Sequence, residues 1–389
     1  MGHAELTACT IYQGAVRALL RVLNEREGID TLLDCVSALA NLSITPALLQ
    51  RRRKSETSLQ TGIGSRDYDS ALENRLITVM GEVASSTTGT KVRCLIATCL
   101  YNFSCNPSNR ELMVRQSHGL FSCRLRCMLI PRRGVLREQV SEGAIVTLLT
   151  LAQPLSALTP QQARDMKAVL DAEVAQGTER VDVAEDAFVL TLCVKAIVNL
   201  STVPQGCVAI VDSGVVTGLR RLWQWLTPRL QASLAADLLH NVTKSRGYSV
   251  KVAEEGAVLV LAQVVNSLVD STNPEDIQIV RRCAVSLCRL TRSLPSSERM
   301  IEEQGVRALT RVVQSLAQGG EHSSDTPSRR IGSRVIRVTT LRRLASAAVS
   351  RLLWRPEMCL AAAAQGACLA VSLLMASQDR YVWWSFRSL

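Results

Sequence analysis

Histidine and cysteine are the side chains that could bind a metal ion or act as nucleophiles, but their spacing suits neither task. The chain has four histidines that stand far apart, and none belongs to a His-Glu-x-x-His motif: His3, His118, His240 and His322. Cys123 and Cys127 form a spaced pair that lacks the remaining ligands of a zinc site. Acidic pairs such as Glu254–Glu255 are better explained as exposed helix surface than as catalytic dyads. We therefore predict a protein that is not an enzyme and holds no metal or cofactor.

An Asn-x-Ser/Thr triplet recurs at the end of apolar runs. Its four occurrences are ALANLS at 38–43, LYNFS at 100–104, IVNLS at 197–201 and LHNVT at 239–243. In a secreted protein such triplets are glycosylation acceptors. The start, MGHAELTACT, has neither the basic residues nor the apolar core of a signal peptide, and the end of an apolar helix leaves no room for a glycan. We therefore interpret the triplets as parts of a structural repeat.

The composition indicates a helical protein with an aliphatic core. Hydrophobic residues make up 47% of the chain and aromatic residues only 4%. No Asn-Gly or Asp-Gly hairpin turn occurs, and β-branched runs are short, so we predict the all-α class. Several of the 13 cysteines lie inside apolar helical runs, where cysteine acts as a small buried hydrophobe in a reducing compartment. We expect a cytoplasmic protein.

A glycine follows each later phrase at a nearly constant distance. The step from phrase to glycine is fifteen residues in three cases and sixteen in one: Asn199 to Gly214, Asn241 to Gly256, Arg351 to Gly366, and Arg289 to Gly305. The repeat period, where uninterrupted, is about 42 residues, as from Asn199 to Asn241. Such a period indicates stacked helical repeats.

The repeat unit predicts a short first helix, a corner glycine, an apolar second helix and a longer third helix that ends at the phrase. Glycine suits the corner because it enters positive φ at little cost. The terminal Ser or Thr is often followed by proline, which ends the long helix and starts the next turn. Six positions before each phrase residue stand side chains that are small or apolar, as tight stacking of long helices requires: Cys35, Ile96, Cys193, Ala235, Cys283 and Ala345.

These features resemble the armadillo repeat, whose third helix closes on Ala-Leu-x-Asn-Leu-Ser and whose first two helices meet at a glycine. The endings here are ALANLS, CLYNFS, AIVNLS and LLHNVT, with LCRLT and VSRLL as degenerate forms. The resemblance covers nearly the whole chain, and HEAT repeats are the nearest alternative. It implies one domain over residues 1–389, a right-handed α-solenoid of about six irregular repeats.

Polar or helical insertions interrupt the repeats. We predict them at four places: 54–70, 115–140, 153–182 and 319–333. An array tolerates such insertions because lengthening a surface loop costs little free energy. The second one splits a first helix, so an error in the gene model is the alternative explanation there.

The resemblance also implies a binding site, because third helices of armadillo proteins line a groove in which a ladder of Asn amides holds an extended peptide. The ladder positions are Asn41, Asn102, Asn199 and Asn241, with Arg289 and Arg351 in the last two repeats. An amide offers a peptide unit both a donor and an acceptor. The alternative is that each Asn bonds neighbouring backbone and only ties the long helix.

The residues one helical turn before each ladder position indicate the kind of partner. Importin-α-like adaptors have Trp there, whereas this chain has Ser37, Thr98, Lys195, Asp237, Val285 and Ala347. Basic residues on or near this face outnumber acidic ones, and the formal net charge is +11. The basic residues are Lys91, Lys195, Arg282, Arg289 and Arg351, and the acidic ones are Asp34 and Asp237. We expect an acidic or neutral protein segment as partner. Nucleic acid is not expected, because no dense basic stripe with interleaved aromatics occurs.

We therefore predict a non-catalytic scaffold or adaptor, with divergent armadillo proteins of cytoskeletal and flagellar assemblies as the analogy. A nuclear transport or chaperone-like adaptor is one alternative. A membrane-tethered regulator is another, because 359–377 is uncharged and is followed by Tyr381, Trp383 and Trp384. The preferred interpretation of 359–377 is a final pair of repeat helices, with the aromatic residues covering the open end or marking a partner surface.

Overall fold

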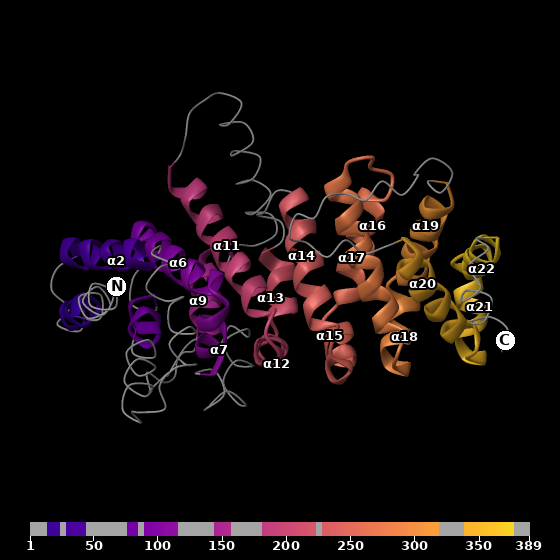
Figure 1. The fold of residues 1–389 in the computed structure, drawn as a ribbon, viewed down its shortest axis with the longest axis horizontal. Helices are drawn as coiled ribbons and strands as arrows, with labels where there is room; N and C mark the ends of the chain where they lie inside the picture. Colours follow the sequence, from indigo (N-terminus) through magenta and orange to yellow (C-terminus); the bar gives the residue numbers. More distant parts are fainter. Residues whose placement is uncertain are drawn as a thin grey trace, which may run out of the picture. The chain divides into compact units, whose positions relative to one another are not determined.

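The chain folds into helices throughout the part that the structure describes (Figure 1). The computed structural model describes these residues: 14–23, 29–43, 76–84, 89–115, 144–156, 181–222, 228–318 and 338–376. Within these ranges all regular secondary structure is helical, which confirms the all-α prediction. The chain divides into two compact units, residues 1–226 and residues 227–389.

The first unit is a stack of long and short helices. Its helices are residues 14–23 and 76–84, α2 (Ile29–Ser43), α6 (Thr90–Cys105), α7 (Pro107–Arg115), α9 (Ala144–Ser156), α11 (Val181–Leu200), α12 (Pro204–Asp212) and α13 (Val215–Leu222). The long helices α2, α6 and α11 pack in sequence order, each against the next. The short helices pair in the same way, α7 with α12 and α9 with α13. Three phrase-bearing helices therefore form one layer of this unit.

The second unit repeats a three-helix pattern. Its helices are α14 (Pro228–Val242), the 3₁₀ turn η3 (Arg246–Tyr248), α15 (Ser249–Glu254), α16 (Ala257–Leu268), α17 (Pro274–Leu290), α18 (Leu294–Glu302), α19 (Gly305–Gln318), α20 (Val338–Leu353), α21 (Pro356–Ala364) and α22 (Ala367–Met375). Long helices α14, α17 and α20 form one layer, and second helices α16, α19 and α22 form another (Figure 1). First helices α15, α18 and α21 form the third layer. Each helix thus packs on its counterpart in the next repeat, as a solenoid requires.

The corner between the first and second helices holds one residue in the left-handed conformation. It is Gly214 with φ 63°, Gly256 with φ 89° and Gly366 with φ 92°. In the remaining repeat the left-handed residue is Gln304, with φ 59°, so the prediction that Gly305 forms this corner is wrong. Gln304 stands fifteen residues after Arg289, which restores the constant step of the other repeats. The left-handed conformation fifteen residues after the phrase is therefore kept even in the repeat where that residue is not glycine.

Gly305 has a packing role instead. It begins α19, and a Cβ atom added to it would come within 2.7 Å of the Met300 sulfur and 2.8 Å of Val258 Cγ1. Val258 belongs to the second helix of the preceding repeat, α16. Glycine at this place lets α19 approach both neighbours closely.

Proline starts many of the helices. Pro107 and Pro204 follow two of the phrases and are the first residues of α7 and α12, as the sequence predicts. The first-turn N–H groups of a helix have no intrahelical partner, so proline costs no hydrogen bond there. Before α17, the Asn273 side chain accepts a hydrogen bond from the Glu275 N–H at 2.9 Å and so caps the helix.

The stacking residues predicted from the six-residue backstep are all buried. Cys35 is 6% exposed, Ala235 is 1% exposed, and the other four are fully covered: Ile96, Cys193, Cys283 and Ala345. Small or slender side chains at this position let consecutive long helices approach each other. Their burial agrees with the predicted stacking role.

Most of the predicted insertions lie outside the described residues. This holds for 54–70 and 319–333, for 116–140, and for 157–180 within the third insertion. The ends of the third insertion are helical, because α9 runs to Ser156 and α11 begins at Val181. The Cys123 and Cys127 pair also lies outside the described residues.

The apolar stretch 359–377 begins within α21 and continues through α22. Among the described residues, no single helix has the length and apolarity to cross a membrane. Helices α21 and α22 together have the required length and apolarity, but one is bent by 83° relative to the other at the break that contains Gly366. Ala362, Ala367 and Ala370 of this pair are buried within the unit.

Candidate functional site on the long helices

The nine residues predicted to line a binding site all lie on long helices. They are Asn41 on α2, Asn102 on α6, Lys195 and Asn199 on α11, Asp237 and Asn241 on α14, Arg282 and Arg289 on α17, and Arg351 on α20. Asn41 is exposed and the others are partly exposed. Each unit therefore presents its share of these side chains on its layer of long helices.

In the first unit two of the three phrase asparagines bond the preceding repeat. Asn102 Nδ2 donates to Ser43 Oγ, and Asn199 Nδ2 donates to Ser104 Oγ, both at 3.0 Å. The two serine hydroxyls in turn donate to main-chain carbonyls three residues earlier, those of Ala40 and Tyr101. From the sequence, the alternative to peptide binding was that each asparagine bonds neighbouring backbone and ties its own long helix. The structure shows a third use, a hydrogen bond between the phrases of consecutive repeats.

The arginines that replace asparagine in the second unit make the same kind of link. Arg351 Nη1 donates to Thr291 Oγ1 at 3.1 Å, and Thr291 is the hydroxyl residue of the preceding phrase. Arg289 Nη1 donates to the His240 carbonyl oxygen at 2.9 Å. The longer guanidinium thus reaches the same turn of the preceding long helix, and its five N–H donors leave capacity for other groups.

Asn41 and Asn241 are placed differently. Asn41 lies in the last turn of α2 and is exposed. Asn241 Oδ1 accepts a hydrogen bond from Lys244 Nζ at 2.8 Å, within the turn that follows α14. The predicted ladder positions therefore differ: four make hydrogen bonds to the preceding repeat, Asn241 bonds Lys244 in its own repeat, and Asn41 is exposed.

The hydroxyl residues of the phrases were predicted only to end the long helices, and their role as hydrogen-bond partners of the next repeat was not predicted. The exposed fraction is 7% for Ser43, 0% for Ser104, 1% for Ser201, 2% for Thr243 and 0% for Thr291. Thr243 and Thr291 also donate to carbonyls of their own helices. The recurrence of Ser or Thr two residues after each phrase asparagine was the signal that could have revealed this pairing.

Two further hydrogen bonds, which were not predicted from the sequence, join the second helix of one repeat to the corner of the next. In the second unit the Leu259 N–H donates to Glu303 Oε2 at 2.7 Å, and the Arg307 N–H donates to Gln365 Oε1 at 3.4 Å. Glu303 and Gln365 each stand one residue before a left-handed corner residue. At these two corners, the residue before the left-handed position therefore caps the second helix of the repeat before it.

A buried ion pair joins three helices of the first unit. Arg93 on α6 is 5% exposed and pairs with Asp186 on α11 at 2.7 Å. Its second guanidinium nitrogen donates to the Leu151 carbonyl oxygen on α9 at 2.6 Å. The buried guanidinium thus has both a carboxylate partner and a carbonyl partner, as a charge held in a core requires.

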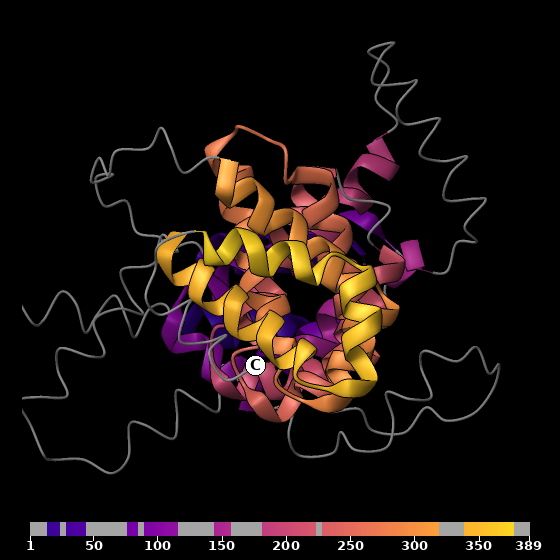
Figure 2. The same ribbon diagram turned by 90° about the vertical axis from the view of Figure 1, so that its right-hand side faces the viewer.

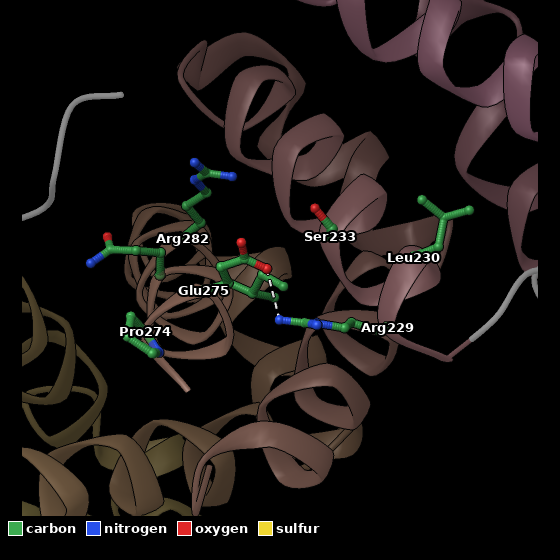
Figure 3. A pocket seen from close by; sticks show the side chains of 8 residues that line it. Arg229, Leu230, Ser233, Pro274, Glu275 and Arg282 are labelled. Carbon is green, nitrogen blue, oxygen red and sulfur yellow. Dashed lines mark hydrogen bonds and ion pairs between the residues drawn. The ribbon is translucent and has the colours of Figure 1, made fainter. Parts of the chain in front are cut away.

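A pocket of about 730 Å³ opens between the amino-terminal halves of α14 and α17. It is lined by charged, polar and apolar side chains: Arg229, Leu230, Ser233, Pro274, Glu275, Gln278, Ile279 and Arg282. Arg229 points toward Glu275 and pairs with it at 2.7 Å (Figure 3). Arg229 also pairs with Asp276 at 3.3 Å, and Arg282 pairs with Asp237. The charges around this pocket are therefore largely matched.

Five cations gather at the carboxyl ends of the long helices in the second unit. We name them the cationic row: Lys244, Arg289, Arg292, Arg351 and Arg355. Lys244 and Arg292 are exposed, and the other three are partly exposed. Two pairs occupy matching places: Lys244 and Arg292 each stand three residues after a phrase residue, and Arg289 and Arg351 are themselves phrase residues. Arg355 stands four residues after Arg351.

The cationic row creates a positive potential at its surroundings. The pKa of His240 is lowered to about 4, first by burial and then by repulsion of the imidazolium by Arg289 and Lys244. Burial also lowers the pKa of Arg289, and the neighbouring Arg292 acts in the same direction. One turn before Asn241, burial raises the pKa of the Asp237 carboxyl, while the positive charge of Arg282 opposes that rise. The row is thus a place where an added negative charge is favoured.

The cysteines of the core are held as thiols. Burial raises the pKa of Cys99, Cys193 and Cys288 to about 12 in each case. A thiol at neutral pH is neither a good nucleophile nor a metal ligand. In the described ranges, no three His, Cys, Asp or Glu side chains are grouped so as to hold a metal ion.

Comparisons with known proteins concern the fold. No protein-family model matches the sequence, and no curated protein matches it. An engineered protein of known crystal structure aligns over 86% of this chain and 97% of its own at 11% identity, with a TM-score of 0.45. A designed armadillo repeat protein aligns over 72% of this chain and 97% of its own at 15% identity, with a TM-score of 0.36. A circular tandem repeat protein aligns over 99% and 96% of the two chains at 14% identity, with a TM-score of 0.29.

These similarities are distant, and the layers of helices within each unit carry the assignment of the fold. Consecutive long helices pack on one another, and the same corner recurs fifteen residues after each of the last four phrases. The chain is an all-α helical-repeat protein.

Proposed function

We propose that the protein is a divergent armadillo-type scaffold that catalyses no reaction and holds an acidic segment of a partner protein along the cationic row. The observation that carries this proposal is the repetition of cations at matched positions of consecutive long helices. A segment with carboxylates spaced along its length would meet one or more cations in each repeat, and Arg pairs well with carboxylates.

The armadillo assignment is supported by the details of the repeat. The unit has three helices, a left-handed corner and a long helix that ends in Asn-x-Ser/Thr or a degenerate form of it. The Trp side chains that importin-α-like adaptors place one turn before the ladder are replaced by Lys195, Asp237, Val285 and Ala347. This difference disfavours the nuclear-import alternative, and a cytoplasmic or cytoskeletal setting stays a prediction.

The pocket between α14 and α17 would suit a neutral part of the same segment. Leu230 and Ile279 give it apolar surface, and its arginines already have carboxylate partners. A side chain entering this pocket need not carry charge. We therefore expect a segment that is acidic where it meets the cationic row and apolar or neutral beside it.

Binding of a synthetic peptide to the full chain tests the proposal. The probe is a fluorescein-labelled peptide of about twelve residues built from Glu, Ser and Leu, which spans about 40 Å when extended. We expect it to bind with an affinity that falls as salt is raised, because surface charges are screened. A peptide with Gln in place of each Glu should bind more weakly.

A paired substitution locates the site. Arg289→Asn with Arg351→Asn removes two charges and restores the residue type that stands in the four earlier phrases. We expect this variant to bind the Glu peptide about tenfold more weakly, since each charge contributes about 0.5–1 kcal/mol. Arg299→Gln is the control, because Arg299 lies on the first helix α18, does not belong to the row, and pairs with Glu302.

Equal binding of the Glu and Gln peptides would refute the proposal. So would an equal loss of affinity in the Arg299→Gln control. A basic peptide of Lys, Ser and Leu that bound more tightly than the Glu peptide would favour the transport-adaptor alternative.

A further inference from the structure

The second helices of the second unit have two separate faces, one toward the preceding repeat and one toward the following repeat. A Cβ atom added to Gly305, one residue after the left-handed corner of α19, would lie 2.8 Å from Val258 Cγ1, two residues after the corner of α16. One added to Gly366, the corner before α22, would lie 3.1 Å from Thr310 Cγ2, six residues after the corner of α19. By helical periodicity, positions one, four and eight therefore face the preceding repeat, and positions two, six and nine face the following repeat.

Helix α19 packs on α16 and on α22, and it buries both faces. Its residues at all six of these positions are buried: Gly305, Ala308 and Val312 on one face, and Val306, Thr310 and Val313 on the other. An inner second helix is therefore covered on both sides by the second helices next to it.

Helix α22 has one of these faces buried and the other exposed. The face toward the preceding repeat is buried: Ala367, Ala370 and Leu374. On the face toward the following repeat, which we name the trailing face, Cys368 and Ser372 are exposed and Met375 is partly exposed. Figure 2 shows this end of the unit facing the viewer, with α21 and α22 in yellow. The same positions of α16 and α19 are buried, so the difference arises from what packs on them.

Residues 14–23 form a helix of the first unit that has the sequence of a second helix. VRALLRV at 16–22 matches VRALTRV at 306–312 of α19 in six of seven residues. In this register the face toward the following repeat is buried: Val16, Leu20 and Leu23. On the face toward the preceding repeat, which we name the leading face, Ala18 is exposed, and Ala15 and Val22 are partly exposed. Helix 14–23 and α22 therefore expose opposite halves of the contact that joins α19 to α16.

Arg21 stands at the place of Arg311, which bonds α19 to the preceding second helix. Arg311 donates to the Asn266 carbonyl oxygen on α16 at 3.2 Å and pairs with Asp270 at 2.7 Å. Arg21 is exposed, and it lies on the helix that carries the leading face. Ala376 follows the corner of α22 by ten residues, as Asn266 follows the corner of α16. Carbonyl groups at the end of a helix carry partial negative charge, so the end of α22 offers an arginine the same kind of partner.

We propose that copies of this chain associate head to tail, with helix 14–23 of one copy packed on α22 of another as α19 packs on α16. The leading face of one copy then covers the trailing face of the next. The two faces belong to different helices, so the contact is heterologous and every copy has both halves of it. A second copy is the occupant that the sequence indicates, because helix 14–23 repeats the helix that covers the same face of α16.

Apolar side chains around the trailing face add to this contact. Leu369 on α22 is 46% exposed, and Leu360 on the adjacent α21 is 85% exposed. A pair of short helices covers less area than a standard interface, which buries about 1,600 Å². We therefore expect reversible association with a dissociation constant of about 10–100 µM.

An engineered disulfide tests the register of the contact. Ala15 stands at the place of Gly305 and Cys368 at the place of Val258, the two positions that meet between α19 and α16. In the full-length variant Ala15→Cys, the new thiol should therefore come within disulfide range of the native Cys368 of another copy. Oxidation with copper phenanthroline at about 100 µM protein, near the expected dissociation constant, should give covalent dimers and longer chains on a non-reducing gel. Mass spectrometry of peptides should identify a link between positions 15 and 368.

Two variants are the controls for the disulfide. Ala15→Cys/Cys368→Ser keeps the new thiol but lacks its partner, so the dimers that depend on this link should disappear. Arg17→Cys places a thiol at an exposed position two residues along the same helix, off the leading face. We expect its link to Cys368 to form with a yield about tenfold lower than that of Ala15→Cys.

Mixed variants test the direction of the contact. Ala18→Glu places a charge on the leading face, and Cys368→Glu places one on the trailing face; both positions are exposed, so the fold should tolerate the changes. Sedimentation velocity of the wild type should show a mass that rises with concentration, and each variant alone should stay a monomer. An equimolar mixture should form dimers and nothing larger, because one intact interface remains between the two variants.

A wild-type mass that stays monomeric at every concentration would overturn the proposal, as would a link between positions 15 and 368 that forms only within single chains. Association lost in Cys368→Glu but kept in Ala18→Glu would also overturn it, because two trailing faces would then meet. The same holds for association that appears only in a variant ending at Ala376, since residues 377–389 would then cover the trailing face.

Discussion

The Asn199 amide donates a hydrogen bond to the Ser104 hydroxyl of the preceding repeat at 3.0 Å. The two residues are 95 positions apart in the chain, yet each belongs to an Asn-x-Ser/Thr phrase. Asn102 and Ser43 make the same contact one repeat earlier. The phrase is therefore a two-sided connector, in which asparagine faces backward and the hydroxyl residue receives the next asparagine.

This connector should be measurable by a double-mutant cycle. We expect Asn199→Ala and Ser104→Ala each to lower the free energy of unfolding, with a coupling energy of about 1 kcal/mol. Urea unfolding of the two single variants and the double variant gives the coupling. Asn41→Ala is the matched control, because Asn41 is exposed at the end of α2, and we expect a change below about 0.5 kcal/mol. A coupling energy indistinguishable from zero would show that the hydrogen bond contributes nothing to stability.

The left-handed corner at Gln304 should be improved by glycine. Left-handed backbone costs a residue with a side chain about 1 kcal/mol or more, so Gln304→Gly should raise the free energy of unfolding by about 1 kcal/mol. Differential scanning calorimetry would record the gain as a higher midpoint. Gln304→Ala is the control, since it removes the same side chain but keeps the Cβ atom. A lower midpoint for the glycine variant would contradict this explanation.

Gly305 should respond in the opposite direction. A Cβ atom there would come within 2.8 Å of Val258 Cγ1, so Gly305→Ala should destabilise the second unit by about 1–3 kcal/mol. The midpoint of urea unfolding measures the loss. Pairing the change with Val258→Ala, which opens space on α16, should recover part of it, and a purely additive double variant would argue against the predicted clash.

The ion pair between Arg93 and Asp186 should be costly to break. Asp186→Ala leaves a guanidinium that is 5% exposed without its carboxylate, and we expect a loss of about 3 kcal/mol in the first unit. Thermal unfolding followed by circular dichroism would detect this. Asp270→Ala is the control, since Asp270 pairs with Arg311 while its own side chain is 84% exposed. Equal effects of the two substitutions would show that burial of the pair does not matter.

His240 should make the stability of the second unit depend on pH. Its pKa is about 4 in the folded protein and 6.5 as the ordinary value, so the unfolded chain binds more protons between these limits. The free energy of unfolding should therefore be highest above pH 6.5 and fall as pH decreases toward 4, by up to about 3 kcal/mol. Urea midpoints measured from pH 7 to pH 4 give this slope. His240→Gln should flatten it, and an unchanged slope in that variant would assign the pH dependence to other groups.

The sequence by itself determined the repeat. Apolar periodicity, the phrase endings and the step to the following glycine placed the long helices and the corners at Gly214, Gly256 and Gly366, because these features report local backbone preference and burial. The six stacking positions from Cys35 to Ala345 were predicted for the same reason, since a close approach of helices excludes large side chains wherever it occurs. Local rules sufficed for each of these features.

The tertiary structure decided which groups bond each other. Whether Asn199 faces a peptide or Ser104 depends on how one long helix is offset against the next, and no local pattern contains that offset. The same holds for Arg93 and Asp186, and for Glu303 at the start of α16. Gln304 is a case in which tertiary packing overrides local preference. Its left-handed backbone is unfavourable for a residue with a side chain, but the packing of α18 and α19 on their neighbours holds it there. Hydrogen bonds between repeats act over a few ångströms, so their partners follow from the packed geometry of the stack.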